Sequence, residues 1–311
     1  MNNRIFLLVL LAAATPASAE PMEVLPSGHP VGEVEIAGAG SKRFIIDTAA
    51  SRTAILPKLR AAMPALPARP AGQPLNGAAG QTKIDLLTLD SISIDGQTSR
   101  QVEAVLLPPS PVDALGVDGV LGTDLFGRYV VEMDMPGRRW DIHGRSSPEL
   151  VAGLLPAVPF RLDDELTARV EVRIDGVAVQ AVLDTGARGT IMNWAAAKLL
   201  GLTPDSPGLA TATPVKGVSQ HGTQSFAATF GSLAIGEASV ARPALRIADL
   251  PVFGVLGFRP DEPALILGID MLADRRFVVD YPAKQLHISP PIAAGSEKAP
   301  SGAFSAAVLP G

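Results

Sequence analysis

The segment QAVLDTGARGTIMN, residues 180–193, places a carboxylate directly after a strand-like apolar run. The run is Ala181 to Leu183, and Asp184 follows it at the start of a Thr-Gly turn. An aspartate in this position often begins a turn by hydrogen bonding to its own backbone two residues on. Taken alone, the motif therefore indicates only a turn, and its meaning depends on the rest of the chain.

The chain repeats this segment near its N-terminus. The two copies are GEVEIAGAGSKRFIIDTAASRT (32–53) and ARVEVRIDGVAVQAVLDTGARGT (168–190). Each reads as an alternating strand, a glycine-containing turn, an apolar strand and then Asp-Thr-X-Ala. Alternation with a period of two is typical of a half-buried strand, and the Asp175-Gly176 pair favours a hairpin turn. Asp47 thus takes the place in the first copy that Asp184 takes in the second.

A second landmark follows each of these acids. Its copies are GVLGTDLFGRYVVEMDMPGRRWDIH (119–143) and LILGIDMLADRRFVVDYPAKQLHIS (265–289). Asp124 and Asp270 correspond at an offset of 146 residues, whereas Asp47 and Asp184 correspond at an offset of 137. Two landmarks repeated in the same order predict a tandem duplication. Asp124 and Asp270 each stand at a short helical signal, so we predict that they are helix N-caps.

Between the landmarks each copy has a glycine-punctuated stretch. These stretches are NGAAGQTK (76–83) and KGVSQHGTQ (216–224). Both predict a hairpin with a mobile tip, and the tip glycines are Gly77, Gly80, Gly217 and Gly222. A flap over a site and an ordinary surface hairpin are equally compatible with this pattern.

An acid turn, a glycine-tipped hairpin and an apolar strand that ends in Leu-Gly occur in this order in both copies. This order resembles one lobe of a retropepsin-like aspartic protease, and two lobes in one chain are similar to the bilobal arrangement of pepsin. The resemblance covers nearly all of residues 30–290 and implies an all-β fold of two similar β-barrel lobes in tandem, with a cleft between them. We expect the lobes at 22–146 and 155–290, with a linker at 147–154.

The resemblance implies that Asp47 and Asp184 form a catalytic dyad. Two carboxylates held about 3 Å apart cannot both ionise, so they share one proton and supply a base and an acid together, as is established for aspartic proteases. It also implies that Thr48 and Thr185 bond across the lobes to support the dyad. The remaining expected site residues are Ala49 and Gly186 in the turns, and Leu121, Gly122, Leu267 and Gly268 packed beneath them.

Three departures from the family pattern surround the acids. Ala49 replaces a glycine, and its Cβ is expected to crowd the opposite turn or to demand a different backbone angle. Ala50 and Ala187 stand where pepsins have a hydroxyl residue, as in retropepsins. Arg188 follows the second turn, where a solvated side chain is favoured over pairing with a carboxylate near the site.

The predicted function is that of an aspartic endopeptidase, which hydrolyses peptide bonds with a water activated by the dyad. One alternative is a non-catalytic peptide-binding protein with a degenerate protease cleft, inactivated by Ala49. Another is a homodimer that uses Asp184 from each chain. The retained Asp47 favours a monomer, and the expected partner is a peptide or protein substrate.

Composition narrows the remaining classes. The net charge of −5 gives no basic footprint for nucleic acid. The chain has no cysteine, which excludes disulfides and thiolate metal sites. The histidines lack metal-ligand spacing and are assigned to surface or loop roles; they are His29, His143, His221 and His287. We expect neither a metal nor another cofactor.

The N-terminal stretch MNNRIFLLVLLAAATPASAE predicts a secretory signal peptide at 1–19. Arg4 precedes a short apolar run, and small residues stand before Glu20. The run is short for a bilayer, which disfavours the alternative of an uncleaved anchor. We therefore expect a protein exported to the periplasm or secreted, with no later membrane span. The tail, 291–311, is rich in Pro, Ala, Ser and Gly and is expected to be disordered.

Overall fold

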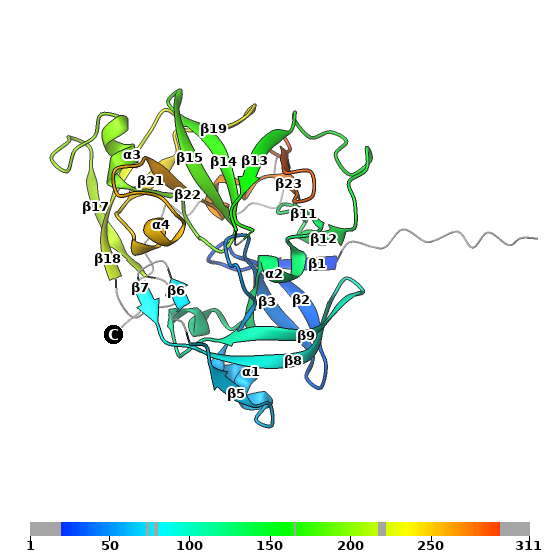
Figure 1. Ribbon diagram of the computed structural model, residues 1–311. Coiled ribbons are helices and arrows are strands. Elements are labelled where there is room, and N and C mark those ends of the chain that lie inside the picture. Colours follow the sequence, from blue (N-terminus) through cyan, green and yellow to red (C-terminus); the bar gives the residue numbers. More distant parts are fainter. Residues whose placement is uncertain (1–19, 73–74, 78–79, 165, 217–221, 293–311) are drawn as a thin grey trace, which may run out of the picture.

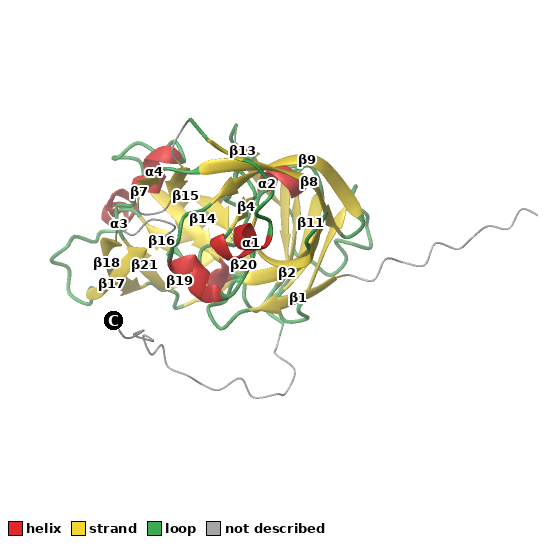
Figure 2. Ribbon diagram, turned by 90° about the horizontal axis from the view of Figure 1, so that it is seen from below, coloured by secondary structure: helices red, strands yellow, loops and turns green. Residues whose placement is uncertain are grey.

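The computed structural model describes residues 20–72, 75–77, 80–164, 166–216 and 222–292. Within these ranges strands dominate and the helices are short, as the yellow and red ribbons show (Figure 2). The helices are α1 (Pro57–Ala62), α2 (Thr123–Phe126), α3 (Trp194–Leu199), α4 (Pro251–Val255) and two 3-10 turns, Pro111–Leu115 and Ile269–Met271. The predicted all-β class is confirmed.

The first half of the chain, residues 20–143, folds around a closed barrel of six strands. These are β2 (Pro30–Ile36), β3 (Gly40–Ile46), β4 (Ala54–Ile55), β8 (Asp85–Ile94), β9 (Gln97–Leu106) and β10 (Gly119–Leu121). They pair in the order β2-β3-β10-β4-β9-β8, and β8 returns to pair with β2. The short strand β5 (Ala68–Pro70) adds to β8, and β6 (Leu75–Gly77) pairs with β7 (Gly80–Thr82) as a separate hairpin.

The second half, residues 158–288, repeats this order. Its strands are β14 (Ala168–Ile174), β15 (Val177–Asp184), β16 (Ile191–Met192), β17 (Ala210–Lys216), β18 (Gly222–Thr229), β19 (Ser232–Ile235), β20 (Ala238–Ala241), β21 (Ala244–Ile247) and β22 (Ala264–Gly268). They pair as β14-β15-β22-β16-β21-β18, and β19 pairs with β14. The two halves lie side by side (Figure 1), and the predicted tandem of similar β-barrel halves is confirmed.

The alternation read from the sequence decides which side chains face the barrel cores. In β2, Val34 and Ile36 are buried while Glu33 and Glu35 are exposed. The burial pattern of β14 also alternates. The Asp-Gly pair between β14 and β15 has positive φ at both residues, 49° and 84°, as a two-residue hairpin turn requires. Local chemistry and core burial therefore agree in the hairpins that lead to the two acids.

Each acid stands at the end of a strand that pairs in parallel with the Leu-Gly landmark. In the first half β3 runs alongside β10, with Ile46 opposite Leu121. In the second half β15 runs alongside β22, with Asp184 opposite Gly268. The strands β3 and β15 pass through the centres of their halves. Each acid therefore comes at the end of a buried strand.

A six-stranded antiparallel sheet joins the halves. Its strands are β1 (Glu20–Val24), β12 (Arg139–His143), β11 (Val130–Asp134), β23 (Arg276–Asp280), β24 (Gln285–Ile288) and β13 (Val158–Leu162), in this order. The two halves meet where β11 pairs with β23, from Val130 opposite Asp280 to Asp134 opposite Arg276. Only a linker was predicted between the lobes, whereas the structure shows a shared sheet.

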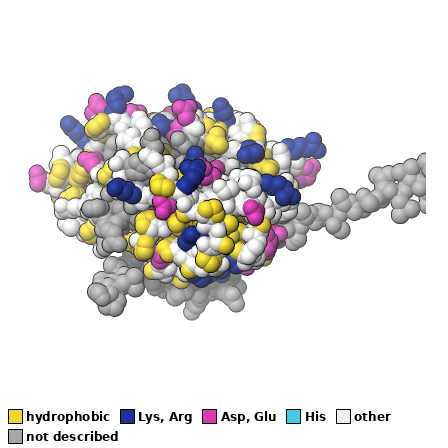
Figure 3. All heavy atoms as spheres, turned by 60° about the horizontal axis from the view of Figure 1, so that its bottom comes forward, with side chains coloured by type: hydrophobic (Ala, Val, Ile, Leu, Met, Phe, Trp, Pro, Cys, Tyr) yellow, Lys and Arg dark blue, Asp and Glu magenta, His cyan; other side chains and the backbone are white. Residues whose placement is uncertain are grey.

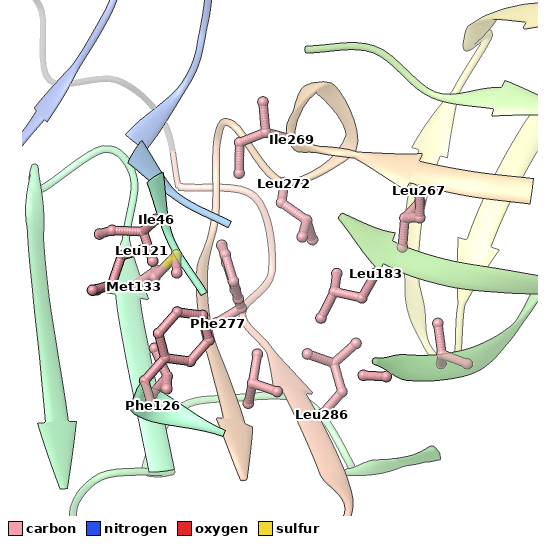
Figure 4. Packing of buried hydrophobic residues seen from close by; sticks show 14 of the residues in the cluster. Ile46, Leu121, Phe126, Met133, Leu183, Leu267, Ile269, Leu272, Phe277 and Leu286 are labelled. Atoms are coloured by element: carbon pink, nitrogen blue, oxygen red, sulfur yellow. The ribbon is translucent and has the colours of Figure 1, made fainter. Parts of the chain in front are cut away.

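The buried side chains on this sheet merge the two cores. Ile46, Leu121 and Met133 of the first half belong to the same apolar cluster as Leu183 and Phe277 of the second half. Figure 4 shows these side chains together, with Phe126 and Leu286 among them. Apolar burial is the main stabilising contribution to folding, so the halves stabilise each other.

The outer parts of the chain add little to this frame. Residues 144–157, which include the predicted linker, contain no helix or strand. The predicted signal peptide and residues 293–311 of the tail lie outside the described residues.

Acidic and basic side chains are interspersed on the face seen in Figure 3. None of the helices in the described ranges has the length and apolar character needed to cross a bilayer.

We expect the thermal stability to fall between about pH 4 and 7 through the carboxyl of Asp95, which lies beside the buried carboxyl of Asp141. Burial and the neighbouring Asp141 carboxyl raise the pKa of Asp95, in the β8–β9 turn, to about 7. The folded protein therefore keeps a proton that the unfolded chain loses near pH 4, and the stability from this pair is lost as pH rises towards 7. Asp95→Asn is expected to unfold at a higher temperature than wild type at pH 8, and at nearly the same temperature at pH 4.5.

Asp175→Asn is the matched control for this measurement. Asp175 occupies the same left-handed position in the β14–β15 turn, with φ of 49° against 45° for Asp95, and asparagine tolerates that position. A melting-temperature difference from wild type that grows with pH in Asp95→Asn but not in Asp175→Asn supports the assignment. Equal behaviour of the two variants contradicts it.

Candidate active site

The two acid turns meet between the halves. Asp47 follows β3, Asp184 ends β15, and both residues are half-buried. Each carboxyl group lies near enough to the other to influence its pKa. Two residues 137 positions apart in the sequence thus end neighbouring turns, one from each half.

Four hydrogen bonds between the turns hold this arrangement. The Thr48 amide donates to Thr185 Oγ1 at 3.1 Å, and the Thr185 amide donates to Thr48 Oγ1 at 3.0 Å. Thr48 Oγ1 donates to the Leu183 carbonyl at 2.8 Å, and Thr185 Oγ1 donates to the Ile46 carbonyl at 2.7 Å. Both threonines are fully buried. Each threonine hydroxyl thus accepts a hydrogen bond from the backbone of the opposite half and donates one to it. These bonds fix the separation of the two turns.

Burial raises the pKa of both acids. Burial raises the pKa of Asp47, against the opposing effect of the Ala49 and Ala50 amides, which donate to Asp47 Oδ1 at 2.9 and 3.0 Å. Burial and the Asp47 charge raise the pKa of Asp184 well above its usual range. Among the described residues, Asp184 Oδ1 is buried and has no hydrogen-bond donor. A buried polar oxygen ordinarily has a hydrogen-bond partner.

The two turns differ in the space around the residue after Asp-Thr. A Cβ on Gly186 would lie 2.2 Å from Asp47 Oδ2, so only glycine fits there. The corresponding Ala49 packs against an apolar cluster of the second half that includes Val182. Neither Ala49 nor Gly186 has a positive φ. Ala49 therefore needs no left-handed backbone, and its methyl group is accommodated by packing.

The Leu-Gly landmarks lie against the turns. The Asp47 amide donates to the Leu121 carbonyl at 3.1 Å. A Cβ on Gly122 would lie 2.8 Å from the Ala50 carbonyl oxygen, and a Cβ on Gly268 would lie 2.9 Å from the Ala187 carbonyl oxygen. Leu121 and Leu267 are fully buried. Close approach of backbone to backbone explains why a glycine stands at both positions.

The predicted N-cap role of Asp124 and Asp270 is wrong. The residues that cap these helical turns are Gly122 and Gly268, without a side-chain bond. Asp124 instead accepts from the amide and hydroxyl of Thr53, at 2.9 and 2.8 Å. Asp270 accepts in the same way from Thr190, at 3.0 and 2.7 Å. Each hydroxyl in turn accepts from the landmark glycine amide, so these acids brace the turns from behind.

A family model described as aspartyl protease matches the chain twice, over residues 32–125 and 170–271. The chain belongs to the aspartyl protease family. The two matched regions fall in the two halves and confirm the retropepsin-like tandem that the sequence predicted. A search of the curated proteins found no match.

In this family member the first predicted flap tip bridges the halves. Gly77 pairs with Gly80 in the β6–β7 hairpin, and β6 lies against α4 of the second half. The second hairpin is formed by β17 and β18, with Lys216 opposite Gly222. Gly217 lies outside the described residues. Both predicted hairpins are thus present, and the first one reaches across the boundary between the halves.

Arg188 is the charged residue that follows the second acid turn. Arg188 is exposed, and its positive charge acts with burial to lower the pKa of His29 and of Arg246. Among the described residues, no cluster of three or more His, Asp or Glu side chains is arranged to hold a metal ion.

His29 was not predicted as a site residue. This residue lies in the loop between β1 and β2, as predicted, but its Nε2 is 3.0 Å from the carbonyl oxygen of Gly186 in the second turn. A signal was present, because β2 and β3 pair with Val31 opposite Ile45. Continuing this register by two residues places His29 opposite Asp47.

Proposed function

We propose that the protein is an aspartic endopeptidase that hydrolyses peptide bonds with a water activated by Asp47 and Asp184. The observation that carries this proposal is the meeting of two carboxyl groups, one from each half, with a buried oxygen of Asp184 that a shared proton would satisfy. The family match supports proteolysis in general.

The chemistry requires one proton on the pair. The ionised carboxyl takes a proton from the water as it attacks the scissile carbonyl carbon, and the protonated carboxyl gives its proton to the carbonyl oxygen. The tetrahedral intermediate then collapses as a proton passes to the leaving nitrogen, and the pair returns to its single-proton state. Each acid reverses its role during the cycle, which suits two carboxyls in nearly equivalent turns.

Both acids come from one chain, so we propose a monomeric enzyme. The same turns support this reading, because the Thr48 and Thr185 bonds are formed within the chain. The substrate would be a peptide or an unfolded protein, whose backbone offers the scissile carbonyl.

The test is hydrolysis of a denatured protein, with and without a peptide inhibitor that carries a hydroxyl-bearing tetrahedral carbon at the scissile position. Cleavage that this inhibitor blocks, and that a metal chelator leaves unchanged, is the expected result. Tight binding of the inhibitor without any cleavage would favour the non-catalytic peptide-binding alternative. Activity that rises with the square of protein concentration would favour a homodimer.

We further propose that residues 1–19 direct export and are then removed. The basic start, the short apolar run and the small residues before Glu20 support this proposal. Strand β1 begins at Glu20, so cleavage there would leave the strand intact. Sequencing the N-terminus of protein recovered from the periplasm or medium tests it, and an N-terminus that retains these residues contradicts it.

The rate of hydrolysis is expected to follow a bell centred at about pH 4–6, not near pH 2. Burial raises the pKa of both acids, and the side chains of Ala50 and Ala187 cannot donate hydrogen bonds that would lower it. A raised pKa keeps the shared proton in place to higher pH, which moves the bell towards neutrality. A pH–rate profile on a denatured protein measures this. A maximum below about pH 3 would show that the backbone amides, or Arg188, outweigh burial.

A further inference from the structure

His29 connects the N-terminal loop of the first half to the catalytic turn of the second half. Its Nδ1 lies 2.7 Å from Ser27 Oγ, and its Nε2 lies 3.0 Å from the Gly186 carbonyl oxygen. The imidazole is half-buried. The hydrogen bond spans 157 residues of sequence, so it forms only when the two halves have come together.

The position is special to the first half. Just as His29 lies opposite Asp47, the pairing of Val170 with Ala181 places Thr167 opposite Asp184. Thr167 is buried, and its amide donates to Asp163 Oδ1 at 2.9 Å. A threonine hydroxyl is much shorter than an imidazole. His29 therefore has no histidine counterpart at the matching position of the second half.

The two hydrogen bonds specify which nitrogen of His29 carries a proton. The Gly186 carbonyl oxygen can only accept, so Nε2 must donate. In the neutral imidazole Nδ1 is then an acceptor, and the Ser27 hydroxyl donates to it. Burial and the Arg188 charge lower the pKa of His29, against the opposing effect of the Gly186 carbonyl. The neutral form with this tautomer therefore persists further into the acid range.

The carbonyl that accepts from His29 belongs to the same peptide unit as the Ala187 amide. That amide donates to the backbone carbonyl of Asp184 at 3.2 Å, and the Ala187 and Gly186 amides both act to lower the pKa of the Asp184 carboxyl. A peptide plane held at its oxygen cannot rotate its N–H away from the acid. We propose that His29 is a positioning residue of this protease, which holds the Gly186–Ala187 peptide so that its N–H stays aimed at Asp184.

This role rests on the proposed function of the two acids. A hydrogen bond accepted by the carbonyl also polarises the peptide unit and strengthens its N–H as a donor. Donation to a carboxylate favours the ionised form, so loss of His29 should make the pair hold its proton to higher pH. The charged group that acts on the imidazole is Arg188, and it remains in place when His29 is replaced.

The experiment compares wild type with His29→Leu and His29→Gln over the full pH range. Leucine removes the donor, whereas the glutamine amide can donate at about the same distance from the backbone. In His29→Leu we expect kcat to fall, KM to stay within about twofold, and both limbs of the kcat/KM profile to move up by about 0.5–1 pH unit. His29→Gln should restore the wild-type position.

A histidine outside the site provides the control. His287 lies on β24 in the central sheet and is also half-buried. His287→Leu should leave the profile where it is. If His29→Leu lowers the rate but its profile stays at the wild-type pH, His29 is only a structural tie and the proposal is wrong.

Two further measurements keep the outcome decisive. If His29→Leu does not fold, Ser27→Ala replaces it in the experiment. Without the Ser27 hydroxyl as a donor to Nδ1, both neutral tautomers of His29 become populated. A smaller upward displacement supports the proposal, and no displacement overturns it. Carboxyl NMR titration of the aspartates reads the same shift without catalysis. An inactive wild type would therefore refute the endopeptidase function, while the titration still decides the role of His29.

Discussion

Asp184→Asn and Asp47→Asn are each expected to reduce hydrolysis of a denatured protein by at least about 10³-fold. The reaction needs one carboxylate and one carboxylic acid at the same time, and an amide can be neither base nor acid. We expect both variants to remain folded. Because burial raises the pKa of both acids, their ionisation costs stability as pH rises, and a neutral amide removes that cost. Their melting temperatures at pH 7 should equal or exceed that of wild type.

Asp261→Asn is the control, since this acid is on the exposed surface of the second half. It should retain full activity. Near-normal turnover in Asp47→Asn together with an inactive Asp184→Asn would show that the pair within one chain is wrong. A homodimer built on Asp184 would then replace it.

Gly186→Ala is expected to lower kcat by about 10²-fold or more. The new Cβ would lie 2.2 Å from Asp47 Oδ2 and 2.3 Å from its Cγ, so the carboxyl must move. The Thr48 and Thr185 bonds hold the turns on both sides and leave the backbone little freedom to yield. Single-turnover measurement of cleavage reports the loss directly.

Ala49→Gly is the matched variant in the other turn, and its activity should stay the same or rise. It should cost about 0.5–1 kcal/mol of unfolding free energy through chain entropy and a lost methyl contact. A clear loss of activity in folded Ala49→Gly would mean that the methyl group tunes the site. Full activity in Gly186→Ala would mean that the position of the Asp47 carboxyl does not matter, which contradicts the proposed chemistry.

The sequence predicted those parts of the fold that repeat. The hairpins before Asp47 and Asp184 carry alternation and turn signals in neighbouring residues, and the parallel partners follow from the Leu-Gly landmarks. The shared sheet was missed because the pairing of β11 with β23 leaves no local pattern: Val130 and Val278 read as ordinary strand residues whatever their partner. The merged core explains why β11 and β23 carry apolar side chains where the two halves meet.

The supporting groups of the site were harder to predict than its acids. Asp124 precedes a helical turn and so resembles an N-cap, yet the Thr53 hydroxyl and amide lie nearer to its carboxyl. Competition between a local and a distant donor depends on tertiary distances that the sequence does not contain. His29 was assigned to a loop correctly, but its bond to Gly186 depends on how the two halves meet.

The shared sheet also imposes an order of events during synthesis. Strand β11 ends at Asp134, and its partner β23 begins only at Arg276. At ribosomal speeds this gap lasts on the order of 10 s. Until then one edge of β11 presents unpaired amides and carbonyls, which can template pairing with another chain. The unfinished polypeptide should therefore be most prone to aggregate in this interval, and a fragment that ends before Arg276 is expected to associate through β11 with a copy of itself.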